Sequence, residues 1–224
     1  MLADGQNDTM KLDIEEYLKG ASLTQDLAIQ EKILNNAIKN FPQEWRAYNN
    51  LGFVQMSKGA TDAALASYQK AEELAGDQKM VKNNIGACYQ VKGDLTKAMS
   101  YYDQAVGAGK EVNYNQGAIK IKEGKYQEAI DMFGTTACFN AALAKLMNGD
   151  TNGALNTITE AENPNDALGF YLKAIIGARS ANTDLLFTNL KLAVQKDAAL
   201  AAKAKKDMEF TKYFEDTTFK SIVQ

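Results

Sequence analysis

The feature that most constrains the fold of this chain is a group of residues that recurs every 34 positions. The pair Leu51-Gly52 is followed at that distance by Ile85-Gly86, and Gly59 is followed by Gly93. The same step relates three further pairs, which are Ala64 with Ala98, Tyr68 with Tyr102, and Ala71 with Ala105. Self-similarity at a period of about 20 to 50 residues is typical of proteins built from stacked units, because one unit cannot bury its apolar face alone.

The same residue types continue along the chain at other steps. A step of 31 relates Gly86, Gly93, Ala98 and Tyr102 to Gly117, Gly124, Ala129 and Phe133. A step of 25 then leads from Gly124 and Ala129 to Gly149 and Ala154, and a step of 32 leads from Ala154, Ile158 and Ala161 to Leu186, Leu190 and Ala193. The steps predict five to six units, near residues 11–44, 45–78, 79–109, 110–134, 135–166 and 167–198. The 25-residue step also predicts that the second helix around 126–133 is short or runs tightly into the next helix.

Each unit has the pattern of two helices joined by a short turn. Residues 46–57 and 61–75 carry apolar or small side chains at helical spacing. Gly59 lies between them, where a helix ends in the left-handed conformation that glycine adopts at low cost. The composition agrees, since the chain has 33 alanines and only 2 prolines, and Pro42 and Pro164 fall between units. We therefore expect an all-α fold of helical hairpins.

These residues resemble the tetratricopeptide repeat (TPR) family over about residues 11–198. Three units carry its signature, at Tyr48, Leu51, Gly52, Gly59, Ala64, Tyr68 and Ala71, then at Asn84, Ile85, Gly86, Tyr89, Gly93, Ala98, Tyr102 and Ala105, and then at Gly117, Gly124, Ala129 and Phe133. The resemblance implies a right-handed α-solenoid of about five to six TPR-like hairpins. The shortened 25-residue step leaves the superhelix geometry after it open.

The two ends of the chain differ from the repeats. Residues 1–10 are polar, and we expect a flexible tail or an arbitrary start of the chain there. At the other end, residues 197–206 are expected to form a short helix, and residues 207–222 another, so that 199–224 cap the last hairpin. The apolar side of this cap would carry Phe210, Tyr213, Phe214 and Phe219. Its sequence resembles the tail that closes repeat arrays in bacterial envelope-associated proteins.

The chain lacks the residues of most catalytic and cofactor sites. It has no histidine, which excludes histidine-dependent nucleophiles, acid–base steps and zinc ligation. Cys88 and Cys138 are 50 residues apart and are expected to be buried, unpaired side chains. There is no phosphate-binding glycine motif, and the net charge of −3 disfavours nucleic-acid binding. We expect neither an enzyme nor a cofactor or metal, and no direct membrane insertion.

The resemblance also implies where a partner would bind. In TPR proteins the first helix of each unit faces a concave groove, and an asparagine near its start often hydrogen-bonds a peptide backbone. Asn50, Asn84, Asn115 and Asn140 share one register, and an amide can both donate and accept. The expected binding residues are Asn49, Asn50, Phe53, Asn83, Asn84, Tyr114, Asn115, Phe139, Asn140 and Tyr171, with more aromatic character toward the C-terminus.

Two alternatives stay open at this point. The asparagines could instead satisfy polar groups between neighbouring helices. The whole chain could be a structural assembly or spacer module of a larger, multidomain protein that packs on neighbouring domains or self-associates, although nothing in the sequence supports a homo-oligomer. Because Asn49 and Phe53 stand where a carboxylate clamp needs lysine and asparagine, we do not expect binding of acidic chaperone tails.

The prediction is therefore a non-catalytic scaffold that binds a protein or an extended peptide segment. If the chain is cut from a longer exported protein, its compartment is the periplasm or cell envelope, and otherwise the cytoplasm.

Overall fold

A computed structural model describes residues 12–224 of the chain, and all the regular secondary structure in these residues is helical. The expected tail at residues 1–10 lies outside the described residues. The described part has fourteen α-helices, one 3-10 helix and no strand. The elements are α1 (Ile14–Ser22), α2 (Leu27–Asn40), α3 (Trp45–Ser57), α4 (Thr61–Ala75), α5 (Lys79–Val91), α6 (Leu95–Gln104), α7 (Lys110–Lys122), α8 (Tyr126–Phe133), α9 (Phe139–Met147), α10 (Thr151–Glu160), α11 (Ala167–Arg179), α12 (Thr183–Lys196), α13 (Ala199–Ala204), η1 (Met208–Tyr213) and α14 (Thr217–Ile222).

The glycines of the repeat have two different roles, and the first is the helix end predicted for Gly59. Gly59 ends the first helix of its pair with φ +76°, a left-handed conformation that is strained for other residues. Gly52 instead lies inside α3, where the ring of Tyr68 from α4 covers it, and a methyl group there would be only 2.7 Å from Tyr68 Cε1. Gly86 and Gly117 are covered in the same way by Tyr102 and Phe133. The recurring glycine–aromatic pair therefore sets how closely the two helices of a hairpin pack.

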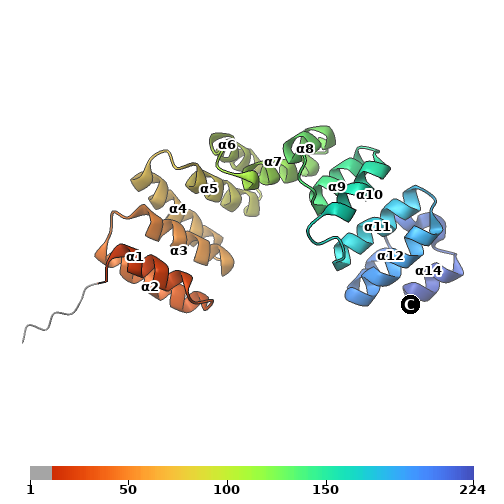
Figure 1. Ribbon diagram of the computed structural model, residues 1–224, viewed down its shortest axis with the longest axis horizontal. Helices are drawn as coiled ribbons and strands as arrows, with labels where there is room; N and C mark the ends of the chain where they lie inside the picture. Colours follow the sequence, from red (N-terminus) through yellow and green to blue (C-terminus); the bar gives the residue numbers. More distant parts are fainter. Residues whose placement is uncertain (1–11) are drawn as a thin grey trace, which may run out of the picture. The chain divides into compact units, whose positions relative to one another are not determined.

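The chain divides into two compact units, residues 1–112 and 113–224, and α7 runs from the end of the first into the second. In the first unit, each helix from α1 to α6 packs against the next, as Figure 1 shows. α3 also contacts α5, so the first helices of neighbouring pairs lie side by side. The buried residues of this unit include Leu34 and Val54 in one cluster and Tyr68 and Ile85 in another. This arrangement is that of an α-solenoid.

The second unit continues the pattern, with shorter helices from α8 to α10. α8 has 8 residues, which confirms the short helix predicted for 126–133. α9 and α10 form the next pair, α11 and α12 the last, and α9 contacts α11. Leu172 and Ile176 of α11 pack on Leu146 and Ile158 of the preceding pair. Neighbouring pairs therefore share one core, as stacked hairpins must.

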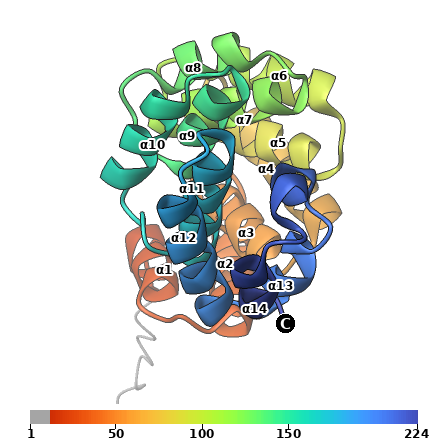
Figure 2. The same ribbon diagram turned by 90° about the vertical axis from the view of Figure 1, so that its right-hand side faces the viewer.

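The segment after α12 differs from its prediction. A single helix was expected over residues 207–222, but the backbone forms the 3-10 helix η1 and then α14. The break has a local cause, because the Asp216 carboxylate accepts hydrogen bonds from the backbone N–H groups of Thr218 and Phe219 and so starts a new helix. Phe210 and Phe219 are buried in the core of the unit, and α13 and α14 lie against α12 (Figure 2).

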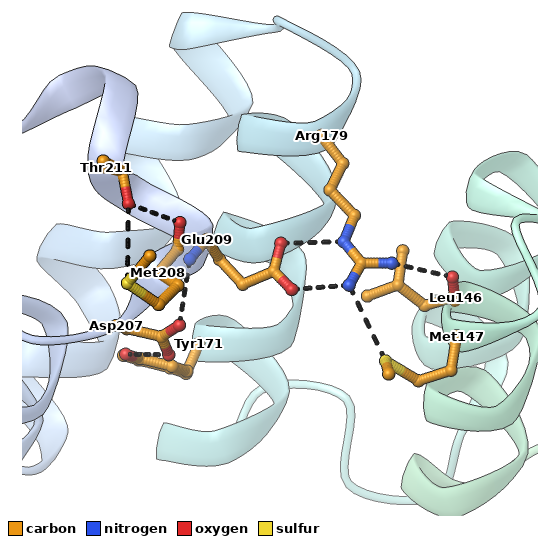
Figure 3. A network of polar contacts seen from close by, with 8 residues as sticks. All are labelled: Leu146, Met147, Tyr171, Arg179, Asp207, Met208, Glu209 and Thr211. Atoms are coloured by element: carbon orange, nitrogen blue, oxygen red, sulfur yellow. Dashed lines mark hydrogen bonds and ion pairs between the residues drawn. The ribbon is translucent and has the colours of Figure 1, made fainter. Parts of the chain in front are cut away.

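A polar network also holds η1 to the helices before it (Figure 3). Arg179 at the end of α11 forms two hydrogen bonds with the Glu209 carboxylate, of 2.8 Å from Nε and 2.5 Å from Nη2. Its Nη1 donates to the backbone carbonyl of Leu146 in α9 at 2.9 Å. One guanidinium thus links three elements of the unit, with the fork geometry that arginine offers to carboxylates.

Candidate functional site

A pocket of about 500 Å³ opens on the first unit, where α1, α3 and α5 contribute side chains with part of α2. Four of the ten predicted binding residues line it, which are Asn49, Asn50, Phe53 and Asn84. The rest of the lining is apolar or neutral, from Leu18, Ala21, Ser22, Gln30, Leu34, Val54 and Met80. The site follows from helical spacing, because positions 50, 53 and 54 lie on one face of α3.

The three asparagines of the pocket form a chain of amides. Asn84 Nδ2 donates to Asn49 Oδ1 at 3.0 Å, which joins α5 to α3. Asn49 Nδ2 in turn approaches Asn50 Oδ1 at 3.4 Å. Asn49, the middle member, is only 6% exposed, while Asn50 and Asn84 are half-buried. Asn49 therefore links the amides of α3 and α5, as the structural alternative for the asparagines predicts, and Asn50 and Asn84 line the pocket on either side of it.

The apolar part of the pocket has a buried floor and an exposed rim. Leu34 and Val54 form the floor and are buried. Phe53 is 64% exposed and Met80 is 48% exposed, which is unusual for large apolar side chains that border the same pocket. A partner that covered both would remove apolar surface from water, and this is the main source of affinity in protein interfaces.

The second unit gathers other predicted residues around Tyr114. Its ring is 42% exposed and packs edge-on against Phe133, with ring centres 5.9 Å apart. Asn140 Nδ2 donates to the Tyr114 hydroxyl at 2.9 Å. Partial burial raises the pKa of Tyr114, and the nearby Cys138 thiol adds to this. The phenol is therefore neutral and can still donate its own proton to a partner.

Tyr171 does not belong to an open surface. Its side chain is 3% exposed, and its hydroxyl donates to Asp207 Oδ2 at 2.9 Å (Figure 3). The Phe210 ring packs edge-on against it at 5.6 Å. Burial, with the Asp207 carboxylate nearby, raises the pKa of Tyr171 strongly. The tyrosine joins the C-terminal segment to α11, and we leave it out of the binding residues.

The remaining predicted binding residues are neither fully exposed nor fully buried. Phe139 is half-buried and packs against the core of its unit. Asn83 and Asn115 are half-buried and already have interaction partners. The pocket also contains a residue that the sequence reasoning missed, Met80, which stands four positions before Asn84 and so shares its helix face. The four-residue spacing between Met80 and Asn84 would have predicted that Met80 lies beside the same pocket.

The two cysteines are both unpaired. Cys88 is buried and Cys138 is half-buried, where its sulfur accepts from the backbone N–H of Ala141 at the start of α9. Within residues 12–224, no group of three or more acidic or cysteine side chains is placed to hold a metal ion. In the same part of the chain, no helix combines the length and the apolar character needed to cross a membrane.

Part of the first unit matches a known protein family. Residues 46–78 and 81–108 match the family described as tetratricopeptide repeat. An uncharacterized protein, ycf37 of Pyropia yezoensis, is 28% identical over 92 residues, which are 41% of this chain and 52% of that protein, so the match spans about half of the relative's length.

Two solved structures show the same fold. One is from the APC/C hetero-tetramer Cut9-Hcn1, with TM-score 0.75, 13% identity, and coverage of 95% of this chain and 43% of that chain. The other is YrrB, described as a TPR protein with an unusual peptide-binding site, with TM-score 0.54, 25% identity, and coverage of 78% of this chain and 98% of that one. The expected link to the bacterial envelope stays a prediction.

Proposed function

Because the chain is a tetratricopeptide repeat protein, we propose that it binds a protein or peptide partner, without catalysis, through the pocket of α1, α3 and α5. The observation that supports this most directly is the convergence of Asn50, Phe53 and Asn84 from two different repeats on one pocket of about 500 Å³. Folds of this type bind proteins or peptides, and YrrB is described as having a peptide-binding site.

The chemistry of the pocket supports the same role. Exposed apolar side chains, Phe53 and Met80, stand beside amides that can donate and accept. Interfaces concentrate their affinity in such apolar anchors, while neighbouring polar groups set the orientation of the partner. The second unit offers another combination of an exposed aromatic ring and an amide at Tyr114 and Asn140, which we propose as a separate contact site.

The test is a selection from a library of random dodecapeptides displayed on phage, with the whole chain as bait. Peptides that are recovered would be synthesised and their affinity measured by fluorescence anisotropy against the chain and an Asn50→Ala, Asn84→Ala double variant. Each lost hydrogen bond contributes about 0.5–1.5 kcal/mol, so we expect the affinity to fall roughly tenfold.

The matched control is Asn36→Ala, an exposed asparagine on α2 that does not line the pocket. It should bind like the unaltered chain, and circular dichroism should show that all variants keep their helices. Equal affinity for the double variant, or a selection that yields no binding peptide, would overturn the proposal.

A further inference from the structure

Resting on this proposed function, we infer that the pocket of α1, α3 and α5 takes an extended, uncharged peptide segment, anchored by one large apolar side chain. Three features of the pocket support the inference. They are the donor and acceptor groups of the asparagine chain, the absence of charged side chains from the pocket lining, and the exposed apolar side chains of Phe53 and Met80.

The amide chain presents one donor and one acceptor at its two ends. Asn84 Nδ2 donates a hydrogen bond to Asn49 Oδ1, and Asn50 Oδ1 accepts one from Asn49 Nδ2. This leaves Asn84 Oδ1 as an acceptor on α5 and Asn50 Nδ2 as a donor on α3. An extended backbone offers the complementary N–H and C=O groups, whereas a helical partner uses most of its own groups internally. The geometry therefore favours an extended segment.

Every side chain that lines the pocket is neutral. Several charged side chains on or next to α1, α2 and α3 form ion pairs, since Lys58 Nζ is 2.5 Å from Glu31 Oε2 and Arg46 contacts both Glu15 and Glu44 at 2.7–2.8 Å. A charged group that entered this pocket would lose water without gaining an opposite charge, which is strongly unfavourable. The pocket therefore excludes acidic and basic anchors alike.

The apolar rim defines what the anchor must be. Phe53 and Met80 are exposed, while Leu34 and Val54 are buried, so both the accessible and the buried parts of the lining are apolar. Methionine is unbranched and adapts to differently shaped apolar side chains. We therefore expect leucine, methionine and phenylalanine anchors to bind, and small or charged residues at the same position to bind weakly.

The test uses acetylated and amidated nonapeptides of alternating serine and alanine, whose central residue is leucine, glutamate or lysine. Each would be titrated into the whole chain, and the side-chain amide signals of Asn50 and Asn84 followed by 1H–15N NMR. The leucine peptide should shift both signals, and its dissociation constant should be at least tenfold lower than those of the other two. A Met80→Lys variant, altered at a half-exposed rim residue, should reverse the order of the leucine and glutamate peptides.

The outcomes separate this inference from the proposed function. Equal or tighter binding of the glutamate or lysine peptide to the unaltered chain would overturn the inference and leave peptide binding itself intact. No shift with any of the three peptides, or no reversal with Met80→Lys, would also overturn it. The proposed function is decided separately by the library selection, which samples charged and uncharged sequences alike.

Discussion

The substitution Gly86→Ala tests the physical reason for the repeated glycine. The added methyl group would lie 2.6 Å from Tyr102 Cε1, 2.8 Å from Cδ1 and 3.2 Å from the Ala98 carbonyl oxygen. Tyr102 is fully buried, and its hydroxyl donates to Gln90 Oε1 at 2.7 Å, so the ring has little room to move. Overpacking of this kind typically costs about 1–3 kcal/mol.

A second effect opposes this cost. Gly86 lies inside α5, and alanine in a helix interior is more stable than glycine by about 0.5–1 kcal/mol. The middle of each range, about 2 and about 0.75 kcal/mol, predicts a net loss of about 1 kcal/mol in the free energy of unfolding. For a chain of this length, that corresponds to a decrease of roughly 2–4 °C in the melting temperature.

The control is Gly20→Ala, because an added methyl group at this helical position in α1 meets nothing within 4 Å. Only the helix-propensity term applies there, so Gly20→Ala should raise the stability slightly. Both variants would be unfolded in urea and followed by far-UV circular dichroism. If Gly86→Ala stabilised the chain as Gly20→Ala does, close packing against the tyrosine could not be the reason for the glycine.

Three further predictions concern other parts of the molecule. Phe53→Ser should weaken peptide binding severalfold but change the urea midpoint little, since the side chain is 64% exposed; a large loss of stability would contradict its place at the rim. Tyr171→Phe should lower the free energy of unfolding by about 1 kcal/mol, because it removes the bond to Asp207, and an unchanged urea midpoint would argue against that contact. Burial raises the pKa of Cys88 from 9.0 to about 11, so the thiol form stabilises the fold below pH 9 and this contribution is lost as the pH rises to 11. Cys88→Ala should therefore reduce the alkaline loss of stability seen in urea unfolding, by up to about 2–3 kcal/mol, and an undiminished loss would contradict this.

Much of the fold could be predicted from short-range patterns. The Gly59 turn depends on one residue with positive φ, and the two helices on either side follow from apolar spacing within each helix. The pairing of Gly52 with Tyr68 could also be predicted, because the pair recurs at a constant separation in the next repeat. Each of these features is decided by residues within about one hairpin of each other.

The candidate site could be predicted only in part, because exposure depends on distant segments. Phe53 and Tyr171 were expected to have the same role, yet the first is exposed at a pocket and the second is buried beneath η1. The difference comes from Asp207 and Phe210, which lie 36 and 39 residues after Tyr171 and cover it. No periodicity in the sequence indicates that a non-repeated segment will fold back on that particular side chain.

The sequence by itself thus determined the hairpins, their order and the residues that let them pack, since small residues at fixed steps and left-handed glycines act locally and in every repeat. Only the tertiary structure decided which asparagine is buried as a link and which two face a pocket. It also decided that Met80 joins that pocket and that the C-terminal segment breaks at Asp216 to cover Tyr171. The physical reason is that burial and hydrogen-bond partners are set by contacts between helices, and these depend on side chains from several hairpins at once.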